Sequence, residues 1–370
     1  MNEREALAIL ISAQRIGYSQ RQHALDEAGS ALSLLADPHA YAHVLGGAGI
    51  AAIREAMRES GRLLEYLDRT GTKLIAIGDP GYPRLLRSIA HPPPLLFCMG
   101  RNDLGDPFPF AVVGTRRASA YGLRHTREIS RELAKAGMTI VSGMAAGIDA
   151  AAHWGALDSQ GRTIAVLGGA LDKPYPAENK GLMQRIVESG GSVISEYPPG
   201  VAPTRYSFVH RNRIIAGMCL GVLVSDAPMK SGAQHTVRMA LDEGREVFAL
   251  PGDVDRPGSQ LPNQLLRDGA HMAACAGDIL SELVVEPDGT KPKKQTEKKN
   301  DIQTAEPALP SRRLDAKEQA VYDLLLEGDM DFDALSEKTG IPGDELGGLL
   351  MMLELDGIVE ALPGLFYRLV

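Results

Sequence analysis

The chain has 370 residues, 44% of them hydrophobic, and a net charge of −8, which predicts more than one folded domain. No segment is long or apolar enough to suggest a membrane span and no secretory signal is visible, so we expect a cytoplasmic protein that does not contact membranes. Residues 315–370 carry a net charge of −10 and residues 107–284 a net charge of +1, so binding of a polyanion requires the central cations to cluster on one face.

Residues 1–70 predict a small helical module. Apolar residues recur at helical spacing, and glycines and an Asp-Pro pair separate the helices from one another. The predicted helices span Glu3–Gln14, Ser19–Ala28, Ala31–Ala36 and Ile50–Leu67.

Residues 71–106 form a predicted connecting segment. The three consecutive prolines within His91–Phe97 are incompatible with a helix. We therefore expect an extended stretch that lies against the next domain.

Residues 107–284 predict a doubly wound α/β domain with a mostly parallel sheet. Short apolar segments alternate with amphipathic ones, and strands of this kind are buried on both faces under covering helices. Right-handed crossovers bring the loops after these strands to one edge of the sheet. Strands are expected near residues 110–113, 138–142, 163–167, 192–195, 220–225 and 246–250, and helices near 122–136, 149–157, 179–189, 211–217, 234–242 and 262–268.

Residues 285–314 are polar and contain proline but no aromatic residue, which favours a disordered linker. Residues 315–370 predict a winged-helix domain, with three helices and a β-hairpin. The helix that would read DNA carries no lysine or arginine, so duplex phosphates would repel it and contact with a protein is the expected role. The helices span Ala316–Leu326, Phe332–Thr339 and Gly343–Asp356, and the strands span Ile358–Ala361 and Leu365–Leu369.

The cysteines Cys98, Cys219 and Cys275 are far apart in the sequence, and each lies among apolar residues. Their spacing indicates neither a disulfide framework nor a metal site. We therefore expect buried, reduced thiols and no metal or other cofactor.

Four loops that follow predicted strands carry glycine, and three of them also carry serine, threonine or arginine. At the shared edge of a parallel sheet, glycine lets backbone N–H groups approach an anion, and the next helix adds partial positive charge. For the loop at Gly114, the simpler interpretation is a tight turn with Arg116 solvated. The sequence has neither a G-x-G-x-x-G fingerprint nor a Walker A loop. The residues expected to hold phosphate are Gly114, Thr115, Arg116, Ser142, Gly143, Gly169, Ser231 and Gly232.

The run Phe208–Arg213 places an aromatic ring beside planar donors that suit phosphates or base edges. Such a combination fits a single strand, because cations follow the backbone while rings stack on bases. The alternative is that the ring belongs to the core and that the arginines pair with acids such as Glu196. The residues that this run and its neighbourhood add to the predicted site are Lys173, Phe208, Arg211, Asn212 and Arg213.

Known catalytic motifs are missing from the sequence. It has no G-x-S-x-G elbow, no H-E-x-x-H and no Cys-x-x-Cys. His235 has no second ligand at metal-binding spacing. We therefore expect a binding protein rather than an enzyme.

Several motifs, in one order, resemble those of the bacterial DNA-processing protein A family, also called DprA or Smf. They run from Tyr82-Pro83 to about Ala270, and the amino- and carboxyl-terminal regions resemble the family's sterile-alpha-motif-like module and winged-helix domain. The chain departs from the family pattern at Ala146, where lysine or arginine is common, at Asp226, where glutamate is common, and in the run Ser231–Thr236. The motifs include Val113-Gly-Thr-Arg116, Ser142-Gly143-x-Ala-x-Gly147-Ile-Asp149 and Phe208-x-x-Arg211-Asn-Arg213-Ile-Ile-Ala-Gly217.

This resemblance implies an extended Rossmann-like domain that binds single-stranded DNA in a basic pocket around Arg116. It also implies a homodimer that delivers the strand to the RecA recombinase in natural transformation, without catalysis of its own.

Two rival functions remain open. The first is a nucleotide phosphoribohydrolase of related fold, although the Pro-Gly-Gly-x-Gly-Thr-x-x-Glu pattern of that group is absent from the corresponding loop. The second is a duplex-specific regulator that acts through the winged helix. Release of base from nucleoside monophosphates identifies the first, and loss of duplex binding on deletion of residues 315–370 identifies the second.

Overall fold

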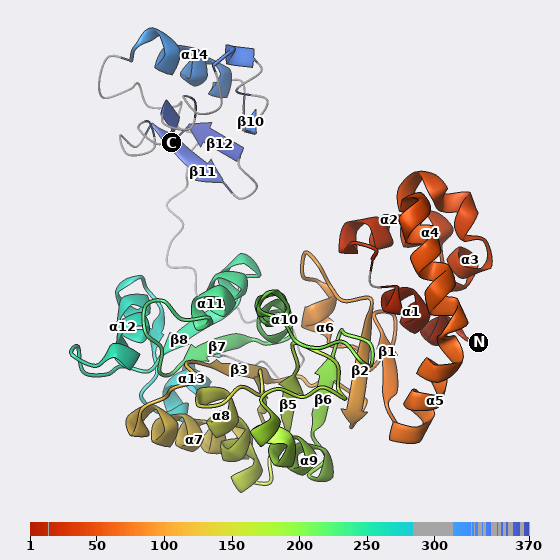
Figure 1. Ribbon diagram of the computed structural model, residues 1–370. Coiled ribbons are helices and arrows are strands. Elements are labelled where there is room, and N and C mark those ends of the chain that lie inside the picture. The colour runs from red at the N-terminus through yellow and green to blue at the C-terminus, as the bar shows by residue number, and fades with distance from the viewer. Residues whose placement is uncertain are drawn as a thin grey trace. The chain divides into compact units, whose positions relative to one another are not determined.

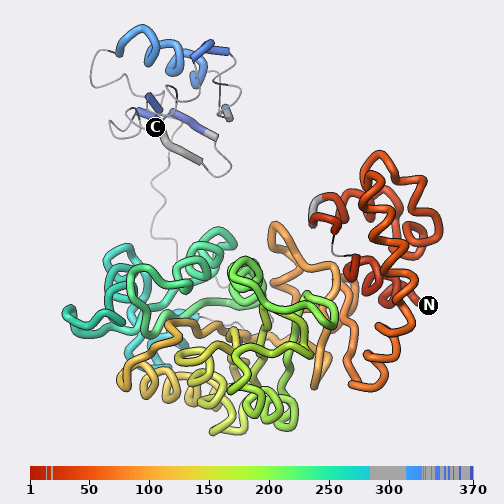
Figure 2. Tube along the Cα trace, viewed as in Figure 1, coloured from red at the N-terminus to blue at the C-terminus, as the bar shows by residue number. Residues whose placement is uncertain are grey.

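The computed structural model describes residues 1–13, 15–283 and 314–369, the last range with gaps at 327, 329, 332–334, 336–337, 342–345, 347–348, 351–352, 354–357 and 363–365. The chain separates into two units, residues 1–292 and 293–370. Figure 2 follows the first unit from the amino-terminal helices into a central sheet. The predicted linker, residues 285–314, lies outside the described residues apart from Leu314. The predicted domain boundaries stay a prediction.

The amino-terminal residues are helical, as the sequence predicts. The predicted helix Ile50–Leu67 is two helices, because α4 ends at Arg58 and α5 begins at Ser60. The apolar faces of these helices share one buried cluster with Leu95 and Phe97 of the sheet. The elements are α1 (Glu3–Ser12), α2 (Tyr18–Ala28), α3 (Ala31–Ala36), η1 (Pro38–Tyr41), α4 (Ala42–Arg58) and α5 (Ser60–Thr70).

A mixed sheet in the order β1-β2-β6-β5-β4-β3-β7-β8-β9 forms the centre of the first unit. The strands from β3 to β9 run parallel, whereas β1 and β2 pair antiparallel at one edge. Every residue of β3 to β7 is buried, as expected for strands covered on both faces, and all six predicted strands are confirmed. The strands are β1 (Lys73–Ala76), β2 (Leu95–Gly100), β3 (Pro109–Val113), β4 (Thr139–Ser142), β5 (Thr163–Val166), β6 (Ser192–Ser195), β7 (Gly221–Val224), β8 (Glu246–Ala249) and β9 (His271–Met272).

Helices cover both faces of this sheet (Figure 1). Side chains of α7 and α8 pack on one face around Phe110, whose ring contacts that of Phe248 at 5.6 Å in an edge-to-face geometry. Side chains of α10, α11 and α12 pack on the other face. The helices are α6 (Arg84–Arg87), α7 (Ala120–Lys135), α8 (Ile148–Asp158), η2 (Ala177–Asn179), α9 (Lys180–Glu188), α10 (Arg205–Gly217), α11 (Ala233–Asp242), η3 (Pro257–Ser259), α12 (Gln260–Arg267) and α13 (Ala276–Glu282).

Helix α10 begins at Arg205, earlier than the predicted residue 211. Its amino terminus is a capping box, in which the Ser207 N–H donates to Thr204 Oγ1 at 3.1 Å and the Thr204 N–H donates to Ser207 Oγ at 2.8 Å. Because serine replaces the usual glutamate of this motif, the sequence pattern did not reveal the start of the helix.

The segment after the three prolines is a strand of the sheet. It was predicted only as an extended stretch, yet β2 pairs with both β1 and β6, and Leu95–Cys98 are buried. The prolines themselves are fixed by the buried Tyr82 hydroxyl, which donates to the Pro93 carbonyl oxygen at 2.8 Å.

The second unit contains α14 (Ala316–Leu325) and a sheet in the order β10-β12-β11. The predicted hairpin is confirmed by the antiparallel pairing of β11 (Val359–Leu362) with β12 (Phe366–Leu369). The strand β10 (Met330–Asp331) was not predicted. The predicted helices Phe332–Thr339 and Gly343–Asp356 lie largely outside the described residues.

The cysteines differ from their prediction in one case. Cys98 and Cys219 are buried, but Cys275 is exposed, because it precedes α13 at the surface of the sheet domain. Burial raises the pKa of the Cys98 thiol to about 12 and that of Cys219 well above its usual value. No helix in the described part of the chain is long and apolar enough to cross a membrane.

We predict that a thiol reagent modifies only one cysteine of the folded protein at pH 8. The thiolate is the reactive species, and burial keeps Cys98 and Cys219 protonated and covered. Colorimetric titration of thiols should give one equivalent in buffer and three in denaturant, and the single native equivalent should vanish in Cys275→Ser. Rapid reaction of a second thiol in buffer would contradict the burial described above.

Candidate nucleic-acid interface

The loops after β3, β4 and β7 contact one another at the carboxyl edge of the sheet. The Thr115 N–H donates to the Asp226 carbonyl oxygen at 2.7 Å, and the Ile148 N–H donates to the Thr115 carbonyl oxygen at 3.2 Å. A Cβ at Gly114 would lie 2.6 Å from Ile148 Cγ1. Gly147 has a φ of 80°, and a Cβ there would lie 2.4 Å from the Thr115 oxygen. Glycine is therefore required at both positions, and the loop after β3 is held in one place.

An exposed arginine lies over two aromatic rings at this edge. The guanidinium carbon of Arg116 is 4.9 Å from the ring centre of Phe208 and 5.8 Å from that of Tyr175. The two rings contact each other at 5.5 Å, and Tyr175 is 49% exposed. A Cβ at Gly168 would lie 2.7 Å from Phe208, so the glycine makes room for the ring. We call Arg116, Tyr175 and Phe208 the Arg116 cluster.

Arg211 lies beneath this edge rather than on it. Its side chain is buried, and Nη1 donates to the carbonyl oxygen of Gly143 at 2.7 Å and to that of Val166. Nε donates to Asn212 Oδ1 at 3.1 Å. Burial lowers the pKa of Arg211 to about 10, an effect that the buried Asp149 carboxylate opposes. The guanidinium therefore joins the ends of β4 and β5.

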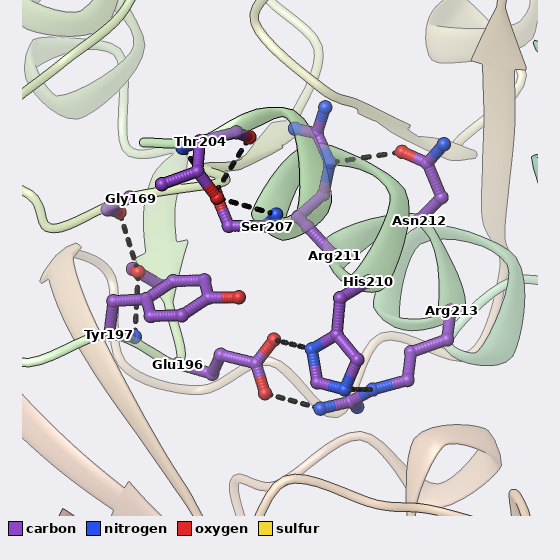
Figure 3. Close-up of polar contacts among 10 residues, drawn as sticks. Gly169, Glu196, Tyr197, Thr204, Ser207, His210, Arg211, Asn212 and Arg213 are labelled. Carbon is purple, nitrogen blue, oxygen red and sulfur yellow. Dashed lines mark hydrogen bonds and ion pairs between the residues drawn. The ribbon is translucent and has the colours of Figure 1, made fainter. Parts of the chain in front are cut away.

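Arg213 is on the same helix as Arg211 but belongs to a separate ion-pair network (Figure 3). Its Nη2 pairs with Glu196 Oε2, and its Nε donates to His210 Nε2 at 3.3 Å. The Nδ1 atom of His210 lies 3.0 Å from Glu196 Oε1. The alternative interpretation of the sequence, that an arginine of this run pairs with Glu196, thus describes Arg213.

Two further residues of the predicted site are part of the framework. Ser142 is fully buried, and its hydroxyl donates to the Val112 carbonyl oxygen at 2.6 Å. The carbonyl oxygen of Gly169 accepts a hydrogen bond from the Ser195 hydroxyl at 2.7 Å. Both residues therefore support the strand ends beneath the Arg116 cluster.

The remaining predicted residues lie at the surface. Lys173 is exposed in the loop that leads to Tyr175. Ser231 and Gly232 precede α11, where the Ser231 hydroxyl accepts from the Ala233 N–H at 3.3 Å. Within residues 1–283 as described, no hydrogen bond or ring contact joins Ser231 or Gly232 to the Arg116 cluster.

Asp226, which the sequence marked only as a departure from the family pattern, is a buried anchor. Its carboxylate accepts from the N–H and the hydroxyl of Ser119, at 2.8 and 2.6 Å, and lies 3.8 Å from Nη2 of Arg256. Arg256 in turn lies over the ring of Tyr121 at 4.3 Å. The sequence shows only an aspartate after an apolar strand, and the partners come from loops far away in the chain.

We predict that Arg211→Ala lowers the free energy of unfolding by about 2–5 kcal/mol, because buried carbonyl groups lose a charged donor and each unmet group costs about 1–3 kcal/mol. Urea denaturation followed by circular dichroism measures the change. The exposed Arg116 provides a matched control, since Arg116→Ala removes only ring contacts worth about 0.5–1 kcal/mol each. Equal destabilisation by the two substitutions would contradict the structural role of Arg211.

Family models match most of the described chain. The model for DNA recombination-mediator protein A matches residues 73–284, and the model for the DprA winged helix domain matches residues 305–364. The first match alone spans the sheet and the whole candidate interface.

Relatives and solved structures agree with these matches. Protein Smf of Escherichia coli is 38% identical over 82% of this chain and 79% of its own length. The X-ray structure of DNA processing protein A from Streptococcus pneumoniae is 35% identical with a TM-score of 0.65 and covers 76% of this chain and 99% of that one. A structure of DNA processing protein A from Helicobacter pylori, described by its single-stranded DNA binding mode, is 31% identical with a TM-score of 0.52 and covers 58% of this chain and 97% of that one. This chain therefore belongs to the DNA-processing protein A (DprA/Smf) family.

Proposed function

We propose that this protein binds single-stranded DNA, without sequence preference, at the Arg116 cluster. The observation that carries the proposal is an exposed guanidinium over the rings of Tyr175 and Phe208 at the carboxyl edge of a parallel sheet. A guanidinium suits a phosphate, and the open face of an aromatic ring suits an unpaired base. The single-strand binding mode named for the Helicobacter pylori relative supports this class of ligand.

We assign the predicted residues to two roles. Arg116, Phe208 and Lys173 contact the strand directly, because Arg116 and Lys173 are exposed and Phe208 forms the ring platform with Arg116. Ser231 and Gly232 lie at the margin of the proposed site and take neither role. The residues that shape the loops and hold them from beneath are Gly114, Thr115, Ser142, Gly143, Gly169, Arg211, Asn212 and Arg213.

We propose further that a homodimer delivers the strand to the RecA recombinase during natural transformation in the cytoplasm. The family description as a recombination mediator supports the delivery of the strand to a recombinase. The buried free thiols of Cys98 and Cys219 suit a reducing compartment such as the cytoplasm. Assembly of RecA on a strand already coated with single-strand binding protein should speed up when this protein is added. Light scattering in solution should give twice the chain mass.

We propose that binding involves no catalytic step. Incubation with nucleoside monophosphates should release no free base, and a stoichiometric release would contradict the proposal.

We predict that Arg116→Ala and Phe208→Ala each weaken binding of single-stranded oligonucleotides of any sequence. The loss for Phe208→Ala should be about 1–3 kcal/mol, as for other stacked rings. For Arg116→Ala, the slope of log binding constant against log salt should become shallower by about 0.7, the contribution of one phosphate contact in a single strand. Fluorescence anisotropy of labelled oligonucleotides over a range of salt concentrations measures both.

The control for this experiment is Arg62→Ala, which removes an exposed arginine from the amino-terminal helices. Its affinity and salt slope should equal those of the unchanged protein. Equal affinity for duplex and single strand would contradict stacking, and unchanged binding in both cluster variants would contradict the location of the site.

A further inference from the structure

A groove of about 430 Å³ runs between α7 and α8, beside the Arg116 cluster. Apolar side chains and a glycine are among the residues that line it, and the two largest apolar ones are Leu123 and Trp154. Both of these large side chains are exposed, at 39% and 36%. Trp154 is the only tryptophan of the chain, and it projects from a helix whose neighbouring residues Gly155 and Ala156 are buried.

The groove is cationic. Arg116, Arg117 and Arg127 line it, and no carboxylate is among its described lining residues. The charge of Arg127 is offset by Asp158, whose Oδ1 lies 2.9 Å from its Nη2. Among the described residues Arg116 and Arg117 have no ion-pair partner, and both are exposed. Two free positive charges therefore face this groove.

The groove continues directly from the Arg116 cluster. Arg116 both covers the ring of Phe208 and lines the groove, so one side chain belongs to both surfaces. Gly147 also lines the groove, at the point where the loops after β3 and β4 meet backbone to backbone. From there Trp154 lies about two helical turns further along α8, roughly 11 Å at 5.4 Å a turn.

A second groove on the far side of Trp154 has the opposite character. It lies against α9 and is lined by Glu178 and Glu188, and its Arg185 pairs with Glu188 at 3.7 Å. A polyanion that reaches Trp154 is therefore attracted along the α7 side and repelled on the α9 side.

We propose that the groove between α7 and α8 binds the continuation of the same single strand, with a phosphate at Arg117 and a base stacked on Trp154. This inference rests on the proposed function of the Arg116 cluster. A cation next to an open aromatic face is the arrangement that follows a flexible strand without reading its sequence. The bound strand thus extends beyond the cluster over the face of α8.

The sole tryptophan reports on this groove directly. Oligo-dT of about 3 and about 20 nucleotides brackets the footprints of about 4–16 nucleotides found for single-strand domains. About 3 nucleotides, roughly 10 Å at 3.4 Å each, are too short to occupy the Arg116 cluster and also reach Trp154. Both should bind in anisotropy measurements, but only the longer one should quench the tryptophan fluorescence. Trp154→Ala should weaken binding of the longer oligonucleotide about tenfold and leave the shorter one unchanged, whereas Trp154→Phe should retain most of the affinity.

Two arginine variants complete the test. Arg117→Ala should weaken only the longer oligonucleotide, and the control Arg185→Ala, on the acidic side of Trp154, should weaken neither. A different outcome is that the longer oligonucleotide binds in a manner that depends on Arg116 but neither quenches the tryptophan nor responds to Trp154→Ala. That result would overturn the groove assignment and leave the proposed function intact. Failure of both oligonucleotides to bind would overturn the proposed function and, with it, this inference.

Discussion

The geometry of the candidate interface depends on one buried cation. Arg211 reaches from α10 to the carbonyl groups of Gly143 and Val166, at the ends of neighbouring strands. A planar guanidinium donates in fixed directions, so it holds both strand ends at a defined distance from the helix. The same helix carries Phe208, and the loop after β4 supports the loop that carries Arg116. Phe208 and Arg116 therefore lie in contact because the buried Arg211 fixes the helix and the loops that carry them.

The sheet was readable from the sequence because its strands are covered on both faces and so appear as short apolar runs between glycine loops. The same pattern predicted that Gly114 and Arg116 lie at the carboxyl edge of the sheet. It did not find β2, because three prolines suggested a connection rather than a strand, nor the start of α10, because serine completes its capping box. Cys275 sits among small and apolar residues, yet a helix cap brings it to the surface.

The sequence did not show which arginine of the motif would pair with Glu196 and which would bind backbone carbonyl groups. Arg211 and Arg213 are two residues apart in one motif, but one binds backbone carbonyl groups and the other pairs with Glu196. Which groups face an arginine depends on crossovers that join distant segments, and spacing along a helix gives only its direction. The motif therefore identified the helix that carries both arginines, but not the different partners of the two side chains.

Formal charge is a poor guide to how this protein meets a polyanion. The chain carries a net charge of −8, and many of the cations of the sheet domain have partners within the fold, as Arg127 has in Asp158 and Arg213 in Glu196. Among the exposed cations of this domain that have no ion pair with a described residue, Arg116, Arg117 and Lys173 lie around the same loops. An acidic protein thus presents a local positive surface around these loops, to which a polyanion is attracted despite the negative net charge.

The shared core of the amino-terminal helices and the sheet has a practical consequence. Leu10 of α1 and Phe97 of β2 belong to one apolar cluster, although the family match begins only at residue 73. A fragment cut at that position would keep every motif of the interface but lose the helices that cover one side of Leu95 and Phe97, at a cost of up to roughly 1.5–3 kcal/mol for each large side chain that becomes exposed. The amino-terminal helices thus cover part of the apolar interior of the sheet, so the excised fragment is expected to expose apolar surface that the longer chain buries.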